Sequence, residues 1–274
     1  MSLLDLAASV AAHDGVDPLN EASRLALDAG DPPRVDHRIE VGGRLVAAAF
    51  SAGEAPVEIL VAPTHRRGGL GGRLLDLCRT DGETGFWAHG DLVPARALAG
   101  SRGLSAGRTL LVLRLRMPQA PARETVPDGV TLRTFEDADA EAVVTVNARA
   151  FADHPEQGAM DLADFRRRAA ADWFDPAGLF VAERDGAVVG FHWTKVEPAP
   201  DGELLGEVYV VGVDPSEHGK GLGTALTARG LRHLFESGVR VVDLYVEGDN
   251  EAALTVYRRL GFDEHARDTL YRAP

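Results

Sequence analysis

Two short glycine-rich segments constrain the fold of this chain more than any other feature of its sequence. The first is Arg66 to Gly71 (Arg-Arg-Gly-Gly-Leu-Gly), and the second is His218 to Gly223 (His-Gly-Lys-Gly-Leu-Gly). Each follows an apolar run that ends in a proline, and each precedes a segment with helical periodicity. A strand, a glycine-rich turn and a helix N-terminus in that order place backbone N–H groups and the positive end of a helix dipole around an anion. The repeat therefore predicts two copies of one anion-binding unit.

The composition narrows the class of protein and of ligand. A chain of 274 residues with 45% hydrophobic and 26% charged residues is typical of a globular protein with one large or two ordinary domains. Its formal net charge of -13 argues against a general nucleic-acid-binding role, which needs a basic surface. Arg66, Arg67 and Lys220 still concentrate positive charge at the two loops, so a small anionic ligand is expected.

The single cysteine, Cys78, lies on an apolar helical face, and we expect a buried structural thiol rather than a nucleophile. One cysteine allows no intramolecular disulfide, and no Cys/His group has zinc-site spacing, so we expect no metal. The N-terminal residues carry an acid within their apolar stretch and lack the basic region of a signal peptide. Because no apolar run is long enough to span a bilayer, the sequence predicts a cytoplasmic protein.

Prolines mark the boundary between two domains. Residues 118–128 read as a linker, so we expect domains at 1–117 and 129–274. Asp185-Gly186 between two apolar runs predicts a β-hairpin turn. In the second half the expected strands are 130–133, 179–182, 187–193, 207–213 and 239–246, and the expected helices are 137–151, 221–236 and 250–260. In the first half the expected strands are 38–41, 44–50, 57–61 and 86–88, with helices that begin at Gly69 and Pro94. This mixture of strands and helices predicts that each half of the chain has an α/β (α+β) fold built on a mostly antiparallel sheet.

Neither loop fits the two commonest phosphate-binding motifs. A P-loop needs Gly-Lys-Ser/Thr, which neither segment contains, and the preceding hairpins do not form the βαβ unit of a Rossmann fold. Both loops instead resemble the Gln/Arg-x-x-Gly-x-Gly/Ala pattern of the GCN5-related N-acetyltransferases (GNAT). Arg66 to Gly71 matches this pattern fully, whereas His218 takes its first position in the second copy. The helix expected after Asn250 resembles the family's Asn-x-x-Ala-x-x-x-Tyr-x-x-x-Gly-Phe segment, with Asn250 as its N-cap.

This resemblance implies two tandem GNAT domains, each a mostly antiparallel mixed sheet flanked by helices, and acetyl-CoA as co-substrate. In that family the backbone amides of the loop hold the CoA pyrophosphate. The residues expected to bind acetyl-CoA in the second half are Val211, Gly212, Val213, His218, Gly219, Lys220, Gly221, Leu222, Gly223, Thr224, Asn250, Glu251, Ala252, Ala253, Leu254 and Thr255. Those expected in the first half are Ile59, Leu60, Val61, Arg67, Gly68, Gly69, Leu70, Gly71 and Gly72.

Acetyl transfer to an amine needs a base, a stabilised carbonyl oxygen and an acid for the leaving thiolate. Glu207 begins the strand that leads into the second loop, and it is either the base, acting directly or through a water, or a solvated strand-end acid. Tyr257 shares a helix face with Asn250, and it is either the acid or a half-buried aromatic residue. Gly212 predicts a β-bulge between Val211 and Val213, whose free N–H groups would stabilise the carbonyl oxygen.

The first half keeps the anion-binding loop but lacks these groups. When the halves are aligned on the proline before each loop, Ala55 stands where the second half has Glu207. When they are aligned on the glycine after each final helix, Ala99 stands where the second half has Tyr257. The sequence thus predicts a first domain that binds acetyl-CoA without performing transfer, and a second domain that catalyses.

Segments 86–90, 154–158, 173–176, 190–196 and 206–215 carry a narrower resemblance. They are similar to the mycothiol synthases, a family of tandem acetyltransferases, and the similarity covers nearly the whole chain. It implies acetyl transfer to the cysteinyl amine of a cysteinyl-glucosaminyl-inositol, the final step of mycothiol biosynthesis. The residues that it implies as acceptor contacts are Glu21, Glu156, Lys195, Glu207 and Tyr245.

Two other interpretations stay open. One is the same chemistry on another amine, such as an aminoglycoside or a protein N-terminus, which the acidic residues would also suit. The other is a non-catalytic acyl-CoA sensor, which would leave Glu207 and Tyr257 without a role. The expected partners are acetyl-CoA and a small-molecule amine for a monomeric chain, with neither nucleic acid nor membrane.

Overall fold

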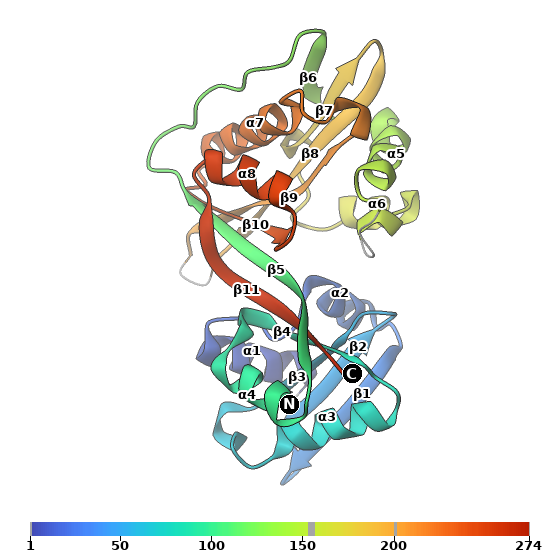
Figure 1. Cartoon of the computed structure of the whole chain (residues 1–274), viewed down its shortest axis with the longest axis vertical. Helices are drawn as coiled ribbons and strands as arrows, with labels where there is room; N and C mark the ends of the chain where they lie inside the picture. The colour runs from blue at the N-terminus through green and yellow to red at the C-terminus, as the bar shows by residue number, and fades with distance from the viewer. Residues whose placement is uncertain (1, 153–156, 200–201, 274) are drawn as a thin grey trace. The chain divides into compact units, whose positions relative to one another are not determined.

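The computed structural model describes residues 2–152, 157–199 and 202–273, and their contacts divide the chain into two compact units. The first unit comprises Met1–Leu111, Glu247–Asp249 and Ala266–Pro274, and the second comprises Val112–Val246 and Asn250–His265. Each unit is a mixed sheet with helices packed on it (Figure 1). The predicted α/β fold class is therefore confirmed for both halves.

In the first unit, two helices precede three consecutive strands, and the sheet has the order β1-β2-β3-β4-β11-β5. The pairs β1–β2, β2–β3 and β4–β11 are antiparallel, and β3–β4 is parallel. The helices are α1 (Leu3–Asp14), α2 (Glu21–Ala29), α3 (Leu70–Thr80) and α4 (Val93–Ser101), and the strands are β1 (Pro33–Val41), β2 (Arg44–Ala52), β3 (Val57–Val61), β4 (Gly85–Ala88) and β5 (Ser105–Arg116). Short 3-10 turns are η1 (Pro63–His65) and η2 (His89–Asp91).

The central strand β2 is buried on both faces, because α1 covers one face and α3 the other. Val46, Ala48 and Phe50 pack with α1. Ala47 and Ala49 pack with α3, in the same cluster as Cys78. Cys78 is fully buried, as predicted, and burial raises the pKa of its thiol to about 11. At neutral pH this thiol is protonated and shielded, which fits a structural role.

The second unit repeats the arrangement with a sheet of order β5-β10-β9-β8-β7-β6. Its strands are β6 (Val130–Thr134), β7 (Leu179–Arg184), β8 (Ala187–Pro198), β9 (Leu204–Val213) and β10 (Val241–Glu247), and its helices are α5 (Ala140–Ala150), α6 (Leu162–Ala169), α7 (Leu222–Glu236) and α8 (Glu251–Arg259). Its 3-10 turns are η3 (Asp137–Asp139), η4 (Gln157–Ala159), η5 (Pro176–Gly178) and η6 (Pro215–Glu217). Asp185 and Gly186 have φ of 51° and 78° between the paired strands β7 and β8, which confirms the predicted hairpin.

An aromatic cluster fills the core beside β8. Trp193 is fully buried, with its ring centroid 5.1 Å from that of Phe165 and 5.4 Å from that of Phe174. Trp173 and Tyr209 complete the cluster, 4.8 Å apart between ring centroids. These rings pack the segment that contains α6 and Trp173 onto the strands that carry the candidate site.

The last strand, β11 (Asp263–Arg272), changes the domain boundaries expected from the sequence. Residues Thr269–Arg272 pair with β4, so this segment belongs to the first unit although it is distant in the chain. The segment expected as a linker belongs to the second unit, where the Pro121 carbonyl accepts a hydrogen bond of 2.9 Å from Arg232. Strand pairing, rather than continuity of the chain, defines each unit.

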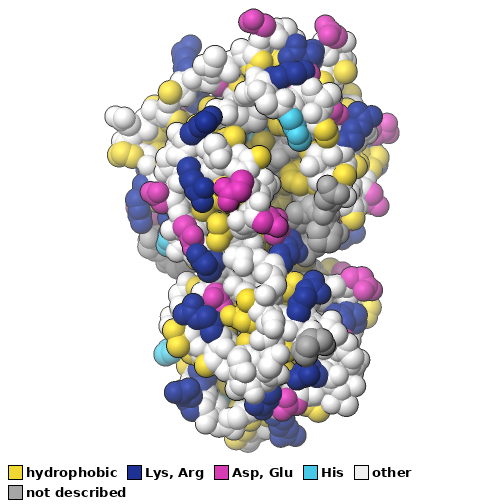
Figure 2. Space-filling model, in the orientation of Figure 1, with side chains coloured by type: hydrophobic (Ala, Val, Ile, Leu, Met, Phe, Trp, Pro, Cys, Tyr) yellow, Lys and Arg dark blue, Asp and Glu magenta, His cyan; other side chains and the backbone are white. Residues whose placement is uncertain are grey.

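The surface carries both signs of charge. Figure 2 shows Lys and Arg side chains interspersed with Asp and Glu side chains on the face that it presents.

Within the described part of the chain, the structure contains no helix with the length and apolar character needed to cross a bilayer.

Candidate functional site

Both glycine-rich segments adopt the same backbone conformation. In each, a strand is followed by a 3-10 turn that begins at a proline, and then by helix α3 or α7. Arg67 and Gly219, at equivalent positions, have φ of 64° and 75°, and Gly69 and Gly221 have φ of 80° and 85°. Among the described residues, no side chain caps the N-terminus of either helix. The first-turn N–H groups of both helices are therefore available to an anion.

The first residue of each loop fastens the turn to the strand before it. The Arg66 Nε donates to the Val61 carbonyl at 3.1 Å, and the His218 Nε2 lies 3.2 Å from the Val213 carbonyl. His218 therefore keeps the contact that Arg66 makes, although it departs from the family pattern. Both oxygens of Asp14 accept hydrogen bonds from Arg66, at 2.7 and 2.6 Å. That carboxylate neutralises Arg66, so the loop must attract an anion mainly through its backbone.

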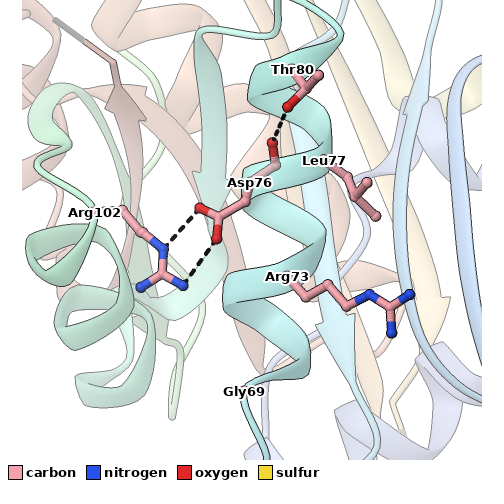
Figure 3. Close-up of a pocket in the computed structure, with 6 residues that line it drawn as sticks. All are labelled: Gly69, Arg73, Asp76, Leu77, Thr80 and Arg102. Atoms are coloured by element: carbon pink, nitrogen blue, oxygen red, sulfur yellow. Dashed lines mark hydrogen bonds and ion pairs between the residues drawn. The ribbon is translucent and has the colours of Figure 1, made fainter.

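A surface pocket in the first unit begins at the loop and continues along α3. Its lining residues are Gly69, Arg73, Asp76, Leu77, Thr80 and Arg102 (Figure 3). The Arg102 guanidinium reaches across from the end of α4 to both oxygens of Asp76, at 2.9 and 3.1 Å. Of these residues only Gly69 was a sequence candidate. Arg102 lies far from the loop in the sequence, so no local pattern connected the two.

In the second unit, Glu207 lies where two parallel strands separate. Strands β9 and β10 pair over three positions, which end at Glu207 opposite Asp243. On its other side, Glu207 lies directly opposite Lys195 of β8. Directly opposed residues share one face of a sheet, so Lys195, Glu207 and Asp243 form a row across three strands. The sequence singled out Glu207 and Lys195, but it did not single out Asp243.

The bulge predicted at Gly212 is wrong, because the register of β8 and β9 runs through that residue without a shift. The shift occurs between Trp193 and Thr194 of β8, where Tyr209 of β9 is the additional residue. Gly212 is a glycine for a different reason: it lies opposite Phe191, whose Cε1 would be 2.4 Å from a Cβ at Gly212. The bulge therefore lies two residues after Glu207, closer to the candidate base than expected.

Lys195 is held by aromatic rings beside this row. It is 8% exposed, and its Nζ lies 5.0 Å from the Trp173 ring centroid and 5.8 Å from that of Tyr209. Its Nζ also forms an ion pair of 2.9 Å with Glu197. The Arg168 Nη1 donates to the Tyr209 hydroxyl at 2.9 Å. A cation fixed in this way is a defined element of the site rather than a mobile surface charge.

Helix α8 carries the candidate acid. The Asn250 side chain accepts a hydrogen bond of 3.0 Å from the Ala253 N–H, which confirms the predicted N-cap. The Tyr257 ring packs edge-on against Phe262, with centroids 5.8 Å apart. Burial raises the pKa of the Tyr257 hydroxyl to about 12. The phenol is therefore protonated at neutral pH, as an acid must be before the reaction.

The other predicted acceptor residues belong to both units of the chain. Glu21 is the first residue of α2 in the first unit, and Tyr245 lies on β10 of the second unit with 52% of its surface exposed. Glu156 lies outside the described residues. The expected acetyl-CoA residues lie at the ends of β3 and β9, in the two loops and in the first turns of α3, α7 and α8. In the described ranges, no group of three or more His, Cys, Asp or Glu side chains has the arrangement of a metal site.

A buried charged cluster in the first unit was not expected. His89 lies between two carboxylates, with Nε2 2.8 Å from Glu58 Oε1 and Nδ1 2.8 Å from Asp268 Oδ2. Glu58 is fully buried, and its Oε1 also accepts the Asn20 N–H at 2.7 Å. Burial opposes a charge on His89, but the hydrogen bonds that its ring nitrogens donate to Asp268 and Glu58 outweigh this effect and raise the pKa to about 10. The sequence showed His89 only as part of a motif, because its partners are distant in the chain.

Comparison with solved structures supports the fold. A GCN5-related N-acetyltransferase from Sphaerobacter thermophilus aligns with a TM-score of 0.73 at 23% identity, over 98% of this chain and 90% of that one. A tandem GNAT protein from the clavulanic acid biosynthesis pathway aligns with a TM-score of 0.67 at 22% identity, over 98% and 93%. At these identities the similarity shows the tandem GNAT fold alone.

Comparison of sequences identifies the family more narrowly than comparison of structures does. The Acetyltransferase (GNAT) family matches residues 145–262, within the half that carries Glu207 and Tyr257. The mycothiol acetyltransferase of Thermomonospora curvata is 50% identical over 99% of this chain and 93% of its own length. That of Kytococcus sedentarius is 48% identical over 98% and 92%. The chain therefore belongs to the mycothiol acetyltransferase family of the GCN5-related N-acetyltransferases.

Proposed function

We propose that this acetyltransferase acetylates the cysteinyl amine of cysteinyl-glucosaminyl-inositol and thereby forms mycothiol. The observation that carries the proposal is the 50% identity to the mycothiol acetyltransferase of Thermomonospora curvata over nearly the full length of both chains. The Glu207 carboxylate and the aromatic rings of Trp173 and Tyr209 suit a small cationic amine, and they would also suit other amines. The acceptor is therefore the part of the proposal that needs an experiment.

The loop of the second unit is suited to hold acetyl-CoA, which supplies the acetyl thioester. A Cβ at Gly219 or Gly221 would meet nothing within 4 Å, so the outer side of the loop has space for phosphate oxygens. The uncapped first turn of α7 offers N–H donors at the same place. Lys220 adds a positive charge, although its Nζ is 3.1 Å from Glu217. The N–H donors of the first turn, the dipole of helix α7 and the open space beside the loop together fit a pyrophosphate group.

Glu207 is the proposed base. An α-amino group has an unperturbed pKa of about 7.7, so a substantial fraction is protonated near neutral pH. Glu207 takes that proton, directly or through a water, and the neutral nitrogen then attacks the thioester carbon. The bulge at Tyr209 interrupts the β8–β9 ladder next to this residue. Because a bulge bends its strand and re-aims the neighbouring side chains, it influences how Glu207 faces the acceptor.

Tyr257 is the proposed acid. The pKa of the Tyr257 hydroxyl is about 12, whereas that of an ordinary thiol is about 8.5. At equilibrium the proton therefore stays on the phenol rather than moving to the thiolate. Tyr257 instead donates a hydrogen bond that strengthens as the carbon–sulfur bond breaks. If the phenol passes its proton to the sulfur, the nitrogen of the new amide then loses a proton, and this proton restores the phenol. The products are a neutral amide and a neutral thiol.

We further propose that the first unit binds acetyl-CoA without transferring the acetyl group. It repeats the loop conformation, but Ala99 stands in the place of Tyr257. Its sheet does contain a carboxylate, Glu58, which is fully buried and whose Oε1 accepts hydrogen bonds from His89 and Asn20. A carboxylate engaged in this way is not available to an incoming amine.

The proposed function is tested by incubating the purified chain with acetyl-CoA and a panel of amines. The panel contains cysteinyl-glucosaminyl-inositol, cysteine amide, an aminoglycoside and a short peptide, and the acetylated product is measured by mass spectrometry. We expect the highest kcat/KM with cysteinyl-glucosaminyl-inositol. A preference for the aminoglycoside or the peptide would replace the proposed acceptor, and binding of acetyl-CoA without any product would favour the sensor interpretation.

The acceptor contacts Glu21, Glu156, Lys195, Glu207 and Tyr245, which the family resemblance implies, belong to this proposal. So do the expectations of a monomeric chain and a cytoplasmic location. A stable dimer in sedimentation velocity, measured at several protein concentrations, would contradict the monomeric state.

A further inference from the structure

A charged pair on the neighbouring strands extends the row that contains Glu207. Asp243 is the last residue of β10 that pairs with β9, directly opposite Glu207. Arg114 of β5 donates from Nε and Nη2 to the two oxygens of Asp243, at 2.7 and 2.6 Å. The four side chains Lys195, Glu207, Asp243 and Arg114 therefore follow one another across the sheet, all within the second unit. None of the roles assigned above uses Asp243 or Arg114.

The pair keeps hydrogen-bonding capacity after its own two bonds are made. A guanidinium has five N–H donors, and a carboxylate has about four acceptor positions. The two hydrogen bonds to Asp243 use one N–H of Arg114 Nε and one N–H of its Nη2. The Arg114 side chain is 25% exposed and that of Asp243 is 10% exposed, so a ligand can reach both. The pair thus offers donors and acceptors side by side in one rigid plane.

The neighbourhood of the pair fits a hydroxyl-rich molecule. A hydroxyl group both donates and accepts, so vicinal hydroxyls are matched by a surface that presents both functions. Tyr245 lies two residues after Asp243 on β10, on the same face of the strand, and is 52% exposed. An exposed ring with a polar end offers an apolar surface for the C–H face of a sugar or cyclitol ring. Glu207, where the amine is acetylated, is the adjacent residue of the row.

We propose that Arg114 and Asp243 are specificity residues that bind the hydroxyl groups of the acceptor, next to the amine at Glu207. The inference rests on the proposed function, because it extends the acceptor site of that reaction. It identifies the second recognised part of the acceptor as a polyhydroxylated ring. A purely structural pair that only joins β5 to β10 would instead affect all acceptors alike.

The test compares two acceptors that share the amine and differ in the hydroxyl-bearing part. These are cysteinyl-glucosaminyl-inositol and cysteine amide, each assayed with saturating acetyl-CoA by mass spectrometry of the acetylated product. For Asp243→Asn and Arg114→Met we expect kcat/KM with cysteinyl-glucosaminyl-inositol to fall about tenfold to a hundredfold, mainly through KM, as for loss of hydrogen bonds to charged groups. With cysteine amide we expect a change of less than about twofold, because that acceptor has no hydroxyl groups to lose.

Asp139→Asn is the matched control. Arg133 donates to both oxygens of Asp139, at 2.6 and 2.8 Å, in the same unit but outside the row. This variant loses a similar ion pair and should leave both acceptors unaffected. An equal loss of kcat/KM on both acceptors in the Asp243 and Arg114 variants, or no loss on either, would overturn the inference while leaving the acetyl transfer intact. If the parent chain acetylates neither acceptor, the proposed function itself fails.

Discussion

At the scale of single residues, two half-buried tyrosines with similar pKa values have different surroundings. Burial raises the pKa of both Tyr257 and Tyr271 to about 12. The Tyr271 hydroxyl donates to Asp91 at 2.8 Å within the first unit. Tyr257 packs against Phe262 at the end of α8, in the half that matches the GNAT family. The same chemical group thus has a structural partner in one unit and a proposed reaction partner in the other.

Replacing Tyr257 by Phe should lower kcat about 10²–10⁴-fold while leaving acetyl-CoA affinity nearly unchanged, because loss of a general acid acts on the transition state. Steady-state kinetics and calorimetric titration with acetyl-CoA measure the two quantities. Tyr271→Phe is the control, and it should retain turnover. Retention of turnover in the Tyr257 variant as well would remove that residue from the mechanism.

Replacing Glu207 by Gln should reduce the rate most at low pH, where less of the amine is already neutral. At high pH the amine needs no base, so the variant should approach the parent. Rates measured from about pH 6 to pH 9.5 with saturating acetyl-CoA test this. Parallel profiles for the two proteins would make Glu207 a binding residue rather than a base.

His89 should make the stability of the first unit depend on alkaline pH. Its ordinary pKa is 6.5, and the folded value is about 10, so folding takes up a proton between these values. The stabilisation is therefore complete below pH 6.5 and is lost as the pH rises toward 10. In His89→Gln the free energy of unfolding should be lower near neutral pH and should change less with pH over that interval. Denaturant titrations of both proteins at several pH values test this, and identical pH dependence would show that His89 is not the titrating group.

At the scale of elements, the two glycine-rich loops form a natural pair for comparison. A Cβ at Gly223 would lie 3.7 Å from Val213 Cγ2, and a Cβ at Gly71 would lie 3.3 Å from Leu98 Cδ2, at the end of a flexible side chain. Neither glycine has a positive φ. Both positions can therefore take a side chain with limited strain, and an acid in the first turn favours a helix.

Gly223→Asp should abolish turnover by placing a carboxylate where the pyrophosphate of the reacting acetyl-CoA would bind, whereas Gly71→Asp should leave turnover largely intact. Calorimetry should find more than one acetyl-CoA site per parent chain, unless the first is filled on purification, and one fewer in the Gly71 variant. A folded but inactive Gly71 variant, or an active Gly223 variant, would contradict catalysis by the second unit.

Elements whose signals are local in sequence could be predicted. The hairpin at Asp185-Gly186 and the N-cap at Asn250 were correct, because a turn or a cap is decided by neighbouring residues. The bulge was misplaced because a glycine in a strand indicates either a bulge or close packing, and Gly212 serves packing against Phe191. Asp243 and the His89 cluster could not be found, because strand pairing brings together residues that are far apart in the chain.

At the scale of the whole molecule, the units are not contiguous in sequence. Residues of β11 complete the sheet of the first unit beside β4, and Leu270 is 1% exposed there. Leu270→Ala should lower the stability of the first unit by about 2–5 kcal/mol, the usual cost of a buried leucine. Arg272→Ala, on the same strand but exposed, should cost much less. Hydrogen exchange of β3 and β4 amides measures the effect, and unchanged exchange in the Leu270 variant would show that β11 is dispensable to the unit.

The late position of β11 has a consequence for synthesis of the protein. The first unit lacks one strand of its sheet until residues 266–272 have left the ribosome. At about 5–20 residues per second, the nascent chain waits roughly 8–30 s after β5 has been made. During that interval the edge of β4 and its apolar residues are open to other chains or to chaperones. If a ribosome stalls within the second half, the released chain therefore has two incomplete units. It does not have a complete first unit that lacks only its partner.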